Sequence, residues 1–161
     1  MRTNVFFRFL VVLFWLLLIM NFSGQGLEQQ DLSPYLEKMK WLEKGILELS
    51  RIQFYYHGEL QDSYADPLGF AHFMIRKTAH FVLYGFLGLS LFWALRGIGL
   101  HRLSSFFITG MVVFIVAVID ESRQYFIPGR TGCFQDVILD VSGCAVFILG
   151  VLLFKFVLKY L

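Results

Sequence analysis

Long apolar runs alternate with polar segments along this chain. Four of the runs are long enough to cross a bilayer, which takes about 20 mostly apolar residues and at least about 17. They cover residues 5–22, 79–95, 103–119 and 137–154. Because all four are short, we expect little tilt and basic residues that snorkel at their ends. The pattern predicts an all-α membrane protein with four transmembrane helices, in a single domain over residues 1–161.

The longest polar segment, residues 23–77, separates the first two runs. Within it, Ser33 followed by Pro34 is typical of a helix N-cap and first turn. Apolar residues then recur every three or four positions, at Tyr35, Met39, Leu42, Ile46 and Leu49. This spacing predicts an amphipathic helix. It would lie on the outer membrane surface or cover the bundle, either as a spacer or as a functional lid.

The composition agrees with a membrane protein. The chain is 57% hydrophobic and 16% charged, whereas soluble domains are about 45–50% apolar and about 25% charged. A soluble fold of this size would expose large apolar patches, and disordered or disulfide-rich classes do not fit either. The net charge is only +2. No basic run alternates with aromatic residues on a polar face, so we expect no nucleic-acid partner.

Basic residues are distributed asymmetrically between the two sides of the predicted membrane. With the N-terminus in the cytoplasm, the cytoplasmic side carries no acid and six basic residues: Arg2, Arg8, Arg96, Arg102, Lys155 and Lys159. All 12 acidic residues then lie outside or in the outer half of the membrane. The positive-inside rule therefore predicts a multi-pass cell-membrane protein with both termini cytoplasmic.

The first apolar run also fits a signal peptide. It has a basic start, an apolar middle and the small residues Ser23 and Gly24 at its end. Cleavage within residues 1–24 would leave the rest of the chain in the same orientation. Both alternatives therefore agree on the topology.

Polar residues from three different spans fall at the same outer level. Lys77, His80 and Tyr84 share one helix face, and Asp136, Asp140 and Gly143 share another. Asp120 and Gln124 share a third face, with Glu121 about 100° round the helix. The Pro128-Gly129 turn returns Arg130 toward the membrane. A carboxylate as deep as Asp140 should face protein or a wet cavity, because exposure to lipid at the bilayer centre costs roughly 2.5–3.5 kcal/mol. The convergence predicts a site.

Cations and carboxylates in a partly desolvated place suit acid/base chemistry or the binding of a charged headgroup. We expect Lys77 and Arg130 to hold an anionic group, and His80 with Asp120 or Glu121 to move protons. The assigned catalytic residues are His80, Asp120, Glu121 and Asp136. The assigned ligand-binding residues are Lys77, Tyr84, Gln124, Arg130 and Asp140.

Each group also has a purely structural interpretation. Arg76 is typical of an interfacial anchor, the acids after residue 119 could mark the point where a helix leaves lipid, and Asp140 could be a hydrogen-bonded structural residue. A metal held by His80 and the acids is an alternative that no ligand spacing such as HExxH supports, so we assign no metal and no cofactor. Walker, dinucleotide and GxSxG motifs are absent from the sequence, which argues against a cytosolic nucleotide-driven enzyme.

Short motifs carry a family resemblance. They are Phe22-Ser23-Gly24-Gln25; Arg76-Lys77-Thr78-Ala79-His80-Phe81 with Tyr84; Asp120-Glu121 with Gln124 and Phe126; Pro128-Gly129-Arg130; and Asp136-Val137 with Gly143. In combination they resemble the VanZ-like family of small bacterial integral membrane proteins, over most of the chain except about residues 32–70. Asp140 stands where the family more usually has Asn, which adds a negative charge. Cys133 stands where Ser is common.

The resemblance implies a role in envelope stress or antibiotic tolerance, because the family's namesake is associated with low-level resistance to teicoplanin-type glycopeptides. The biochemical activity of that namesake is not established. Some members carry a phosphotransbutyrylase label. This sequence does not support that label, because acyl-phosphate and CoA chemistry belongs in the cytosol and these polar residues face outward.

Three functions are consistent with these observations. The first is a site at the outer membrane face that binds or acts on a cell-envelope component, such as a lipid-linked or anionic headgroup, with membrane lipids as partners. The second is a non-catalytic membrane interaction protein whose polar cluster is structural. The third is a small transporter, although the inner halves of the spans offer few polar residues beyond Ser90 and Thr109. The sequence leaves catalysis and the oligomeric state open.

Overall fold

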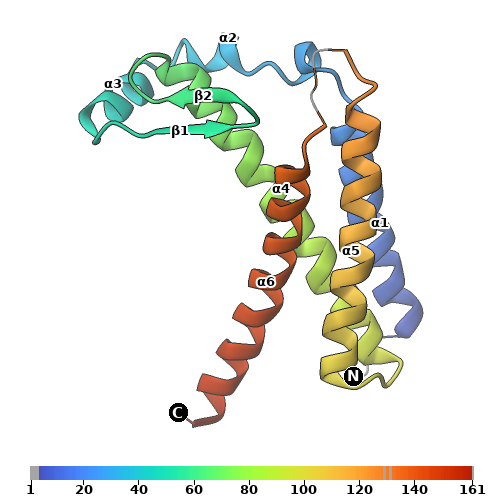
Figure 1. The fold of residues 1–161 in the computed structure, drawn as a ribbon. Coiled ribbons are helices and arrows are strands. Elements are labelled where there is room, and N and C mark those ends of the chain that lie inside the picture. Colours follow the sequence, from blue (N-terminus) through green and yellow to red (C-terminus); the bar gives the residue numbers. More distant parts are fainter. Residues whose placement is uncertain (1–3, 129, 131, 161) are drawn as a thin grey trace.

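Four long helices dominate the computed structural model, which describes residues 4–128, 130 and 132–160. They are α1 (Val5–Ser23), α4 (Pro67–Gly97), α5 (Arg102–Gln124) and α6 (Phe134–Tyr160). Each is long and apolar enough to cross a membrane. Both ends of the chain and the α4–α5 connection lie at one end of the bundle, and the α5–α6 connection lies at the other (Figure 1). The predicted all-α membrane architecture is confirmed.

The helices extend beyond the apolar runs at the end opposite the termini. α4 begins at Pro67 rather than near residue 79. At this start of the helix, the Asp66 carboxylate accepts a hydrogen bond from the Gly69 N–H at 2.9 Å. α5 continues to Gln124, and α6 begins at Phe134. Hydropathy indicates where contact with lipid ends. The backbone hydrogen bonds of a helix do not depend on that boundary, so the helices continue into the polar region. The extra turns carry most of the polar residues of interest.

The segment between α1 and α4 is more broken than the periodicity predicts. It contains a 3₁₀ turn (Leu27–Gln30), α2 (Ser33–Leu36) and α3 (Lys40–Glu48). The prediction of one continuous helix is wrong, because α2 and α3 are separated at residues 37–39. The N-cap of α2 is Leu32, one residue before the predicted Ser33. The predicted apolar stripe stays largely exposed, and within α2 and α3 only Leu36 is buried.

A small antiparallel hairpin follows, which the sequence reasoning did not predict. Its strands are β1 (Gln53–Tyr56) and β2 (Glu59–Asp62), with Tyr56 opposite Glu59. The two connecting residues, His57 and Gly58, have φ of 51° and 78°. Two consecutive positive φ angles are typical of the type I′ turn, whose twist matches that of the flanking strands.

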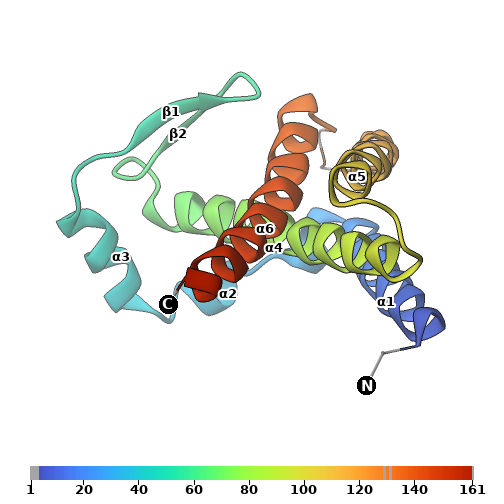
Figure 2. The same ribbon diagram turned by 90° about the horizontal axis from the view of Figure 1, so that it is seen from below.

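α4 is the central helix and packs against each of the other three. Figure 2 shows α6 crossing α4, with α1 and α5 beside the other half of α4. Trp15 of α1 stacks on Phe86 of α4 at a centroid distance of 4.9 Å. Arg8, inside the first span, donates to the Trp93 carbonyl at 2.9 Å, so its polar group is satisfied within the protein.

Small residues allow α4 and α6 to approach closely. A Cβ on Gly143 would lie 2.2 Å from the Phe81 carbonyl oxygen, and a Cβ on Gly88 would lie 2.3 Å from the Cys144 Sγ. Such close contact is the usual basis of helix association in lipid, where there is no hydrophobic driving force between helices. Close steric packing at these glycines therefore stabilises the contact between α4 and α6.

The first prediction concerns this contact. Gly143→Ala should lower the free energy of unfolding by about 1–3 kcal/mol, because the added methyl overlaps backbone that cannot move cheaply. Gly150→Ala is the matched control on the same helix, since nothing lies within 4 Å of a Cβ there. Thermal unfolding in detergent, followed by circular dichroism, measures both. Equal melting temperatures for the two variants would contradict the proposed role of the contact.

Candidate functional site

α4 and α6 run in the same direction and pair charged residues across their contact. The Lys77 ammonium forms an ion pair with Asp136 Oδ1. One turn further along, His80 Nδ1 lies 3.5 Å from Asp140 Oδ1. Spacings of three residues on α4 and four on α6 therefore meet across the interface. Asp136 and Asp140 lie in the first two turns of α6, which begins at the end of the bundle away from the termini (Figure 1).

The hairpin contributes to the first of these pairs. The Tyr56 hydroxyl donates to Asp136 Oδ1 at 2.6 Å, and the Lys77 ammonium lies 4.6 Å from the centroid of the Tyr56 ring. Burial, followed by the hydrogen bond to Asp136, raises the pKa of Tyr56 above its usual range, so the phenol stays a donor. Sequence reasoning missed Tyr56, because nothing in its local pattern points to a partner 80 positions away.

Acid and amide groups at the end of α5 form a connected network. Ser23 of α1 donates to Asp120 Oδ1. Gln124 Nε2 donates to Asp120 Oδ2 at 3.2 Å and to Glu121 Oε1 at 3.1 Å. The Cys133 backbone N–H donates to Glu121 Oε2 at 2.9 Å. Both carboxylates are therefore held in place, and both are buried, with 3% and 5% of their residues exposed.

Arg130 is a buried cation with neutral partners. Only 9% of the residue is exposed. Its Nη1 donates to Gln124 Oε1 at 3.0 Å and its Nη2 donates to Gln30 Oε1. Among the described residues it forms no ion pair with a carboxylate. Burial lowers the pKa of Arg130, and the nearby positive charge of Arg76 lowers it further.

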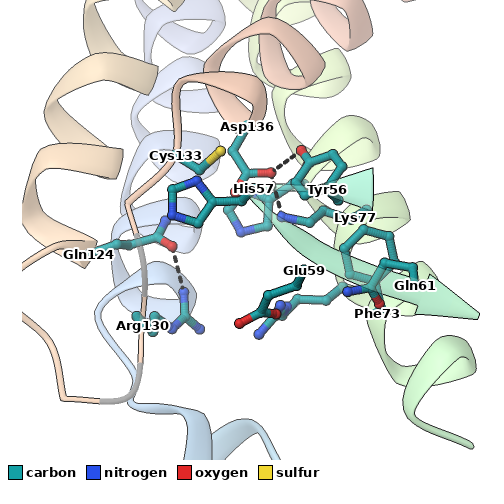
Figure 3. A pocket seen from close by; sticks show the side chains of 12 residues that line it. Tyr56, His57, Glu59, Gln61, Phe73, Lys77, Gln124, Arg130, Cys133 and Asp136 are labelled. Atoms are coloured by element: carbon teal, nitrogen blue, oxygen red, sulfur yellow. Dashed lines mark hydrogen bonds and ion pairs between the residues drawn. The ribbon is translucent and has the colours of Figure 1, made fainter. Parts of the chain in front are cut away.

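These side chains converge on a cavity of about 160 Å³ beneath the hairpin (Figure 3). Its lining includes Arg76, Lys77, His80, Gln124, Arg130 and Asp136. A second hollow of about 530 Å³, lined largely by apolar side chains of α1 and α4 such as Phe22 and Leu83, shares Arg76 and His80 with the first. The polar cavity thus adjoins this second hollow, the apolar groove.

All of the predicted site residues lie in this region, in two connected parts. Lys77, Asp136, Gln124 and Arg130 line the cavity. The others surround His80, which lines both hollows: Asp120, Glu121, Asp140 and Tyr84, whose ring centroid is 6.2 Å from that of His80. The geometry brings these residues together in one region.

Three further residues belong to the region although they were not assigned to it. Arg76, interpreted from the sequence as an interfacial anchor, lines both hollows. Gln30 contacts Arg130 from the segment after α1, and Ser23 contacts Asp120. Ser23 belongs to one of the family motifs, and this was the signal in the sequence that could have assigned it to the site. Gln30 lies in a polar segment whose fold the sequence did not reveal.

The fold and this region define a class: a four-helix integral membrane protein with a buried polar site near one end of the bundle. The chain belongs to the VanZ/LLP1 family, whose sequence model matches residues 6–157. The resemblance inferred from the motifs is therefore confirmed, and the match extends through residues 32–70, which the motifs did not cover. No curated protein and no solved structure matches the chain.

The second prediction tests the buried ion pair. Lys77→Met should destabilise the fold by about 3–5 kcal/mol, because it leaves the Asp136 carboxylate buried without its cation. Adding Asp136→Asn should restore much of that loss, since the neutral amide needs no counter-charge. Chemical or thermal unfolding in detergent gives these values.

Lys44→Met is the matched control for the ion pair. Lys44 lies 3.8 Å from Glu48 in an exposed pair on α3, and such pairs contribute about 0–1 kcal/mol. If Lys77→Met costs no more than Lys44→Met, the Lys77–Asp136 pair has no structural importance.

Proposed function

We propose that this protein binds the anionic headgroup of a cell-envelope amphiphile at the outer face of the cell membrane. One observation carries the proposal: two guanidinium groups, Arg76 and Arg130, stand at one cavity, and the side-chain hydrogen bonds that buried Arg130 makes with the described residues go to amide oxygens. A buried charge is costly unless it is paired. Guanidinium groups bind phosphate and carboxylate in a bidentate manner, so an anion of this kind is the natural partner.

The apolar groove supports an amphiphile rather than a free anion. It adjoins the cavity and shares Arg76 and His80 with it. A headgroup held by the two arginines could therefore extend an acyl or prenyl chain along α1 and α4. Lys77 is already paired with Asp136, so we assign it to shaping the cavity more than to binding the anion.

The orientation of the chain follows from its charges and is part of the proposal. Arg96, Arg102 and Lys155 line a hollow at the end of the bundle near the termini. The positive-inside rule favours a cytoplasmic location for that end. The cavity then faces outward, where lipid-linked envelope precursors and phospholipid headgroups are available.

Any reaction at this site would depend on the groups around His80. His80 with Asp120 or Glu121 is suited to moving protons to and from a bound headgroup, since these groups meet at the boundary of cavity and groove. Asp136 accepts from both Lys77 and Tyr56, which favours positioning over proton transfer. By analogy with the namesake of the family, we also propose a contribution to teicoplanin-type glycopeptide tolerance.

The alternative, a non-catalytic interaction protein with a structural polar cluster, makes a different prediction. Replacing a cluster residue would then lower stability or abundance without changing any ligand binding. Each functional variant below is therefore compared with wild type for melting temperature as well as for binding.

The third prediction concerns orientation. In a Cys133→Ser, Cys144→Ala background, Ser50→Cys should react with a membrane-impermeant maleimide in intact cells. His101→Cys, in the connection between α4 and α5, should react only after permeabilisation. Both positions are exposed, whereas Cys133 itself is buried and would be a poor probe. The reverse labelling pattern would place the cavity in the cytoplasm and overturn the proposal of an external headgroup.

The fourth prediction tests the anion. Purified protein should retain phosphatidylglycerol or a polyprenyl phosphate in native mass spectrometry, in preference to phosphatidylcholine. Arg130→Gln should weaken this retention by about tenfold or more, because it removes a charge-assisted bidentate contact. Arg102→Gln, at the opposite end of the bundle, is the matched control and should behave as wild type.

The same variants test the proposed link to tolerance. Expression of wild type in a susceptible Gram-positive host should raise the inhibitory concentration of teicoplanin, and Arg130→Gln should abolish the increase at equal abundance in the membrane. Retention of phosphatidylcholine equal to that of the anionic lipids, or unchanged binding by Arg130→Gln, would contradict headgroup recognition.

A further inference from the structure

We propose that His80, Asp120 and Glu121 form a site for one divalent transition-metal ion, Zn²⁺ or Mn²⁺, between α4 and α5. One ligand atom from each residue lies within 4.8 Å of the other two. Ligands about 2.1 Å from a common ion lie up to about 4.2 Å apart, so small side-chain adjustments close the site. This inference does not rest on the proposed headgroup function.

The charge balance of the cluster favours a cation. Asp120, Glu121 and Asp140 are all buried, and Asp140 has no exposed surface. Among the described residues, their ion pairs are the 3.5 Å contact between Asp140 and His80 and a 3.7 Å contact between Asp120 and the partly exposed Arg123. Buried carboxylates are normally paired or bound to metal. Asp136 needs no further cation, because Lys77 already neutralises it.

Unpartnered polar atoms provide a second, independent indication. The Tyr84 hydroxyl and Asp140 Oδ2 are buried and have no hydrogen-bond partner among the described residues, and the contact of Asp140 Oδ1 with His80 Nδ1 is long, at 3.5 Å. The Tyr84 ring stacks beside His80 at a centroid distance of 6.2 Å, which places Tyr84 next to the cluster. More than nine in ten buried polar groups have a partner. A metal ion in this cluster, or a water molecule bound to it, would be a partner for several of these polar groups at once.

The surroundings resemble the outer shell of a metal site. His80 Nδ1 faces Asp140, an arrangement that orients an imidazole and leaves Nε2 for the ion. Ser23, Gln124 and the Cys133 N–H each donate to a carboxylate oxygen of Asp120 or Glu121. Each such oxygen has two lone pairs, so these bonds hold the carboxylates in place and still leave a lone pair for the metal.

The donor set selects the class of ion. An imidazole nitrogen suits zinc and the other transition metals, whereas carboxylate oxygens also suit manganese. One imidazole with two carboxylates therefore favours Zn²⁺ or Mn²⁺ over Mg²⁺ or Ca²⁺, which take oxygen ligands. No motif spacing revealed the set, because His80 lies on α4 and the two acids lie on α5. The expectation of no metal, drawn from the absence of such a spacing, is replaced by this proposal.

The fifth prediction tests the site on the full chain, free of affinity tag and stripped with chelator in detergent. Titration with ZnCl₂ or MnCl₂, followed by desalting and elemental analysis, should give about one bound ion per chain. His80→Gln and Glu121→Gln should weaken binding by about tenfold or more, as loss of even outer-shell partners does at known sites. His72→Gln on α4 and Glu43→Gln on α3 are matched controls and should bind as wild type.

A spectroscopic measurement keeps the test independent of how the variants fold. Wild-type protein loaded with Mn²⁺ should show coupling to an imidazole nitrogen in pulsed electron paramagnetic resonance, and the His72→Gln variant should retain it. Substoichiometric binding of both ions by wild type, a wild-type spectrum without nitrogen coupling, or loss of the coupling in His72→Gln would overturn the proposal. Failure of the lipid-binding experiment would leave this result unaffected.

Discussion

The close approach of α4 and α6 at Gly143 sets the positions of the remaining polar groups. With the Phe81 carbonyl against this glycine, there is no space for a side chain, so the observed register of the two helices requires glycine at this position. That register places Lys77 opposite Asp136 and His80 opposite Asp140. The energetic reason is specific to lipid: because hydrocarbon does not drive apolar helices together, close backbone packing and interhelical polar contacts must do so.

Opposite charges at this end of the bundle are only partly paired with each other. Arg76 and Arg130 gather at the cavity, while Asp120, Glu121 and Asp140 surround His80. Gln124 lies between the two parts, donating to the acids and accepting from Arg130. A neutral amide can satisfy both sides without neutralising either. This arrangement is the basis of the two proposals, an anion bound at the arginines and a cation bound at the acids.

The segment between α1 and α4 covers this region at the end of the bundle away from the termini. Tyr56 reaches Asp136, and the His57 backbone N–H donates to Gln135 at 2.9 Å, so the hairpin is docked on the start of α6. Gln30 reaches Arg130 from the other side. The exposed apolar residues of α2 and α3, such as Tyr35 and Trp41, are consistent with contact to the membrane surface. The cavity is thus bounded on one side by the connecting segment and on the other by the spans.

Hydropathy and helical periodicity are local properties, so they were enough to predict the spans, the asymmetry of basic residues and the gathering of polar residues from α4, α5 and α6 at one level. The sequence by itself did not determine the hairpin, the interruption between α2 and α3, or the partners of Arg130 and Asp136. The contacts of the connecting segment with the spans join distant positions: Tyr56 and Asp136 are 80 residues apart, and Gln30 and Arg130 are 100 apart. Such contacts follow only from the packing of the whole chain, because the register of α4 against α6 depends on the shapes of both helices at once.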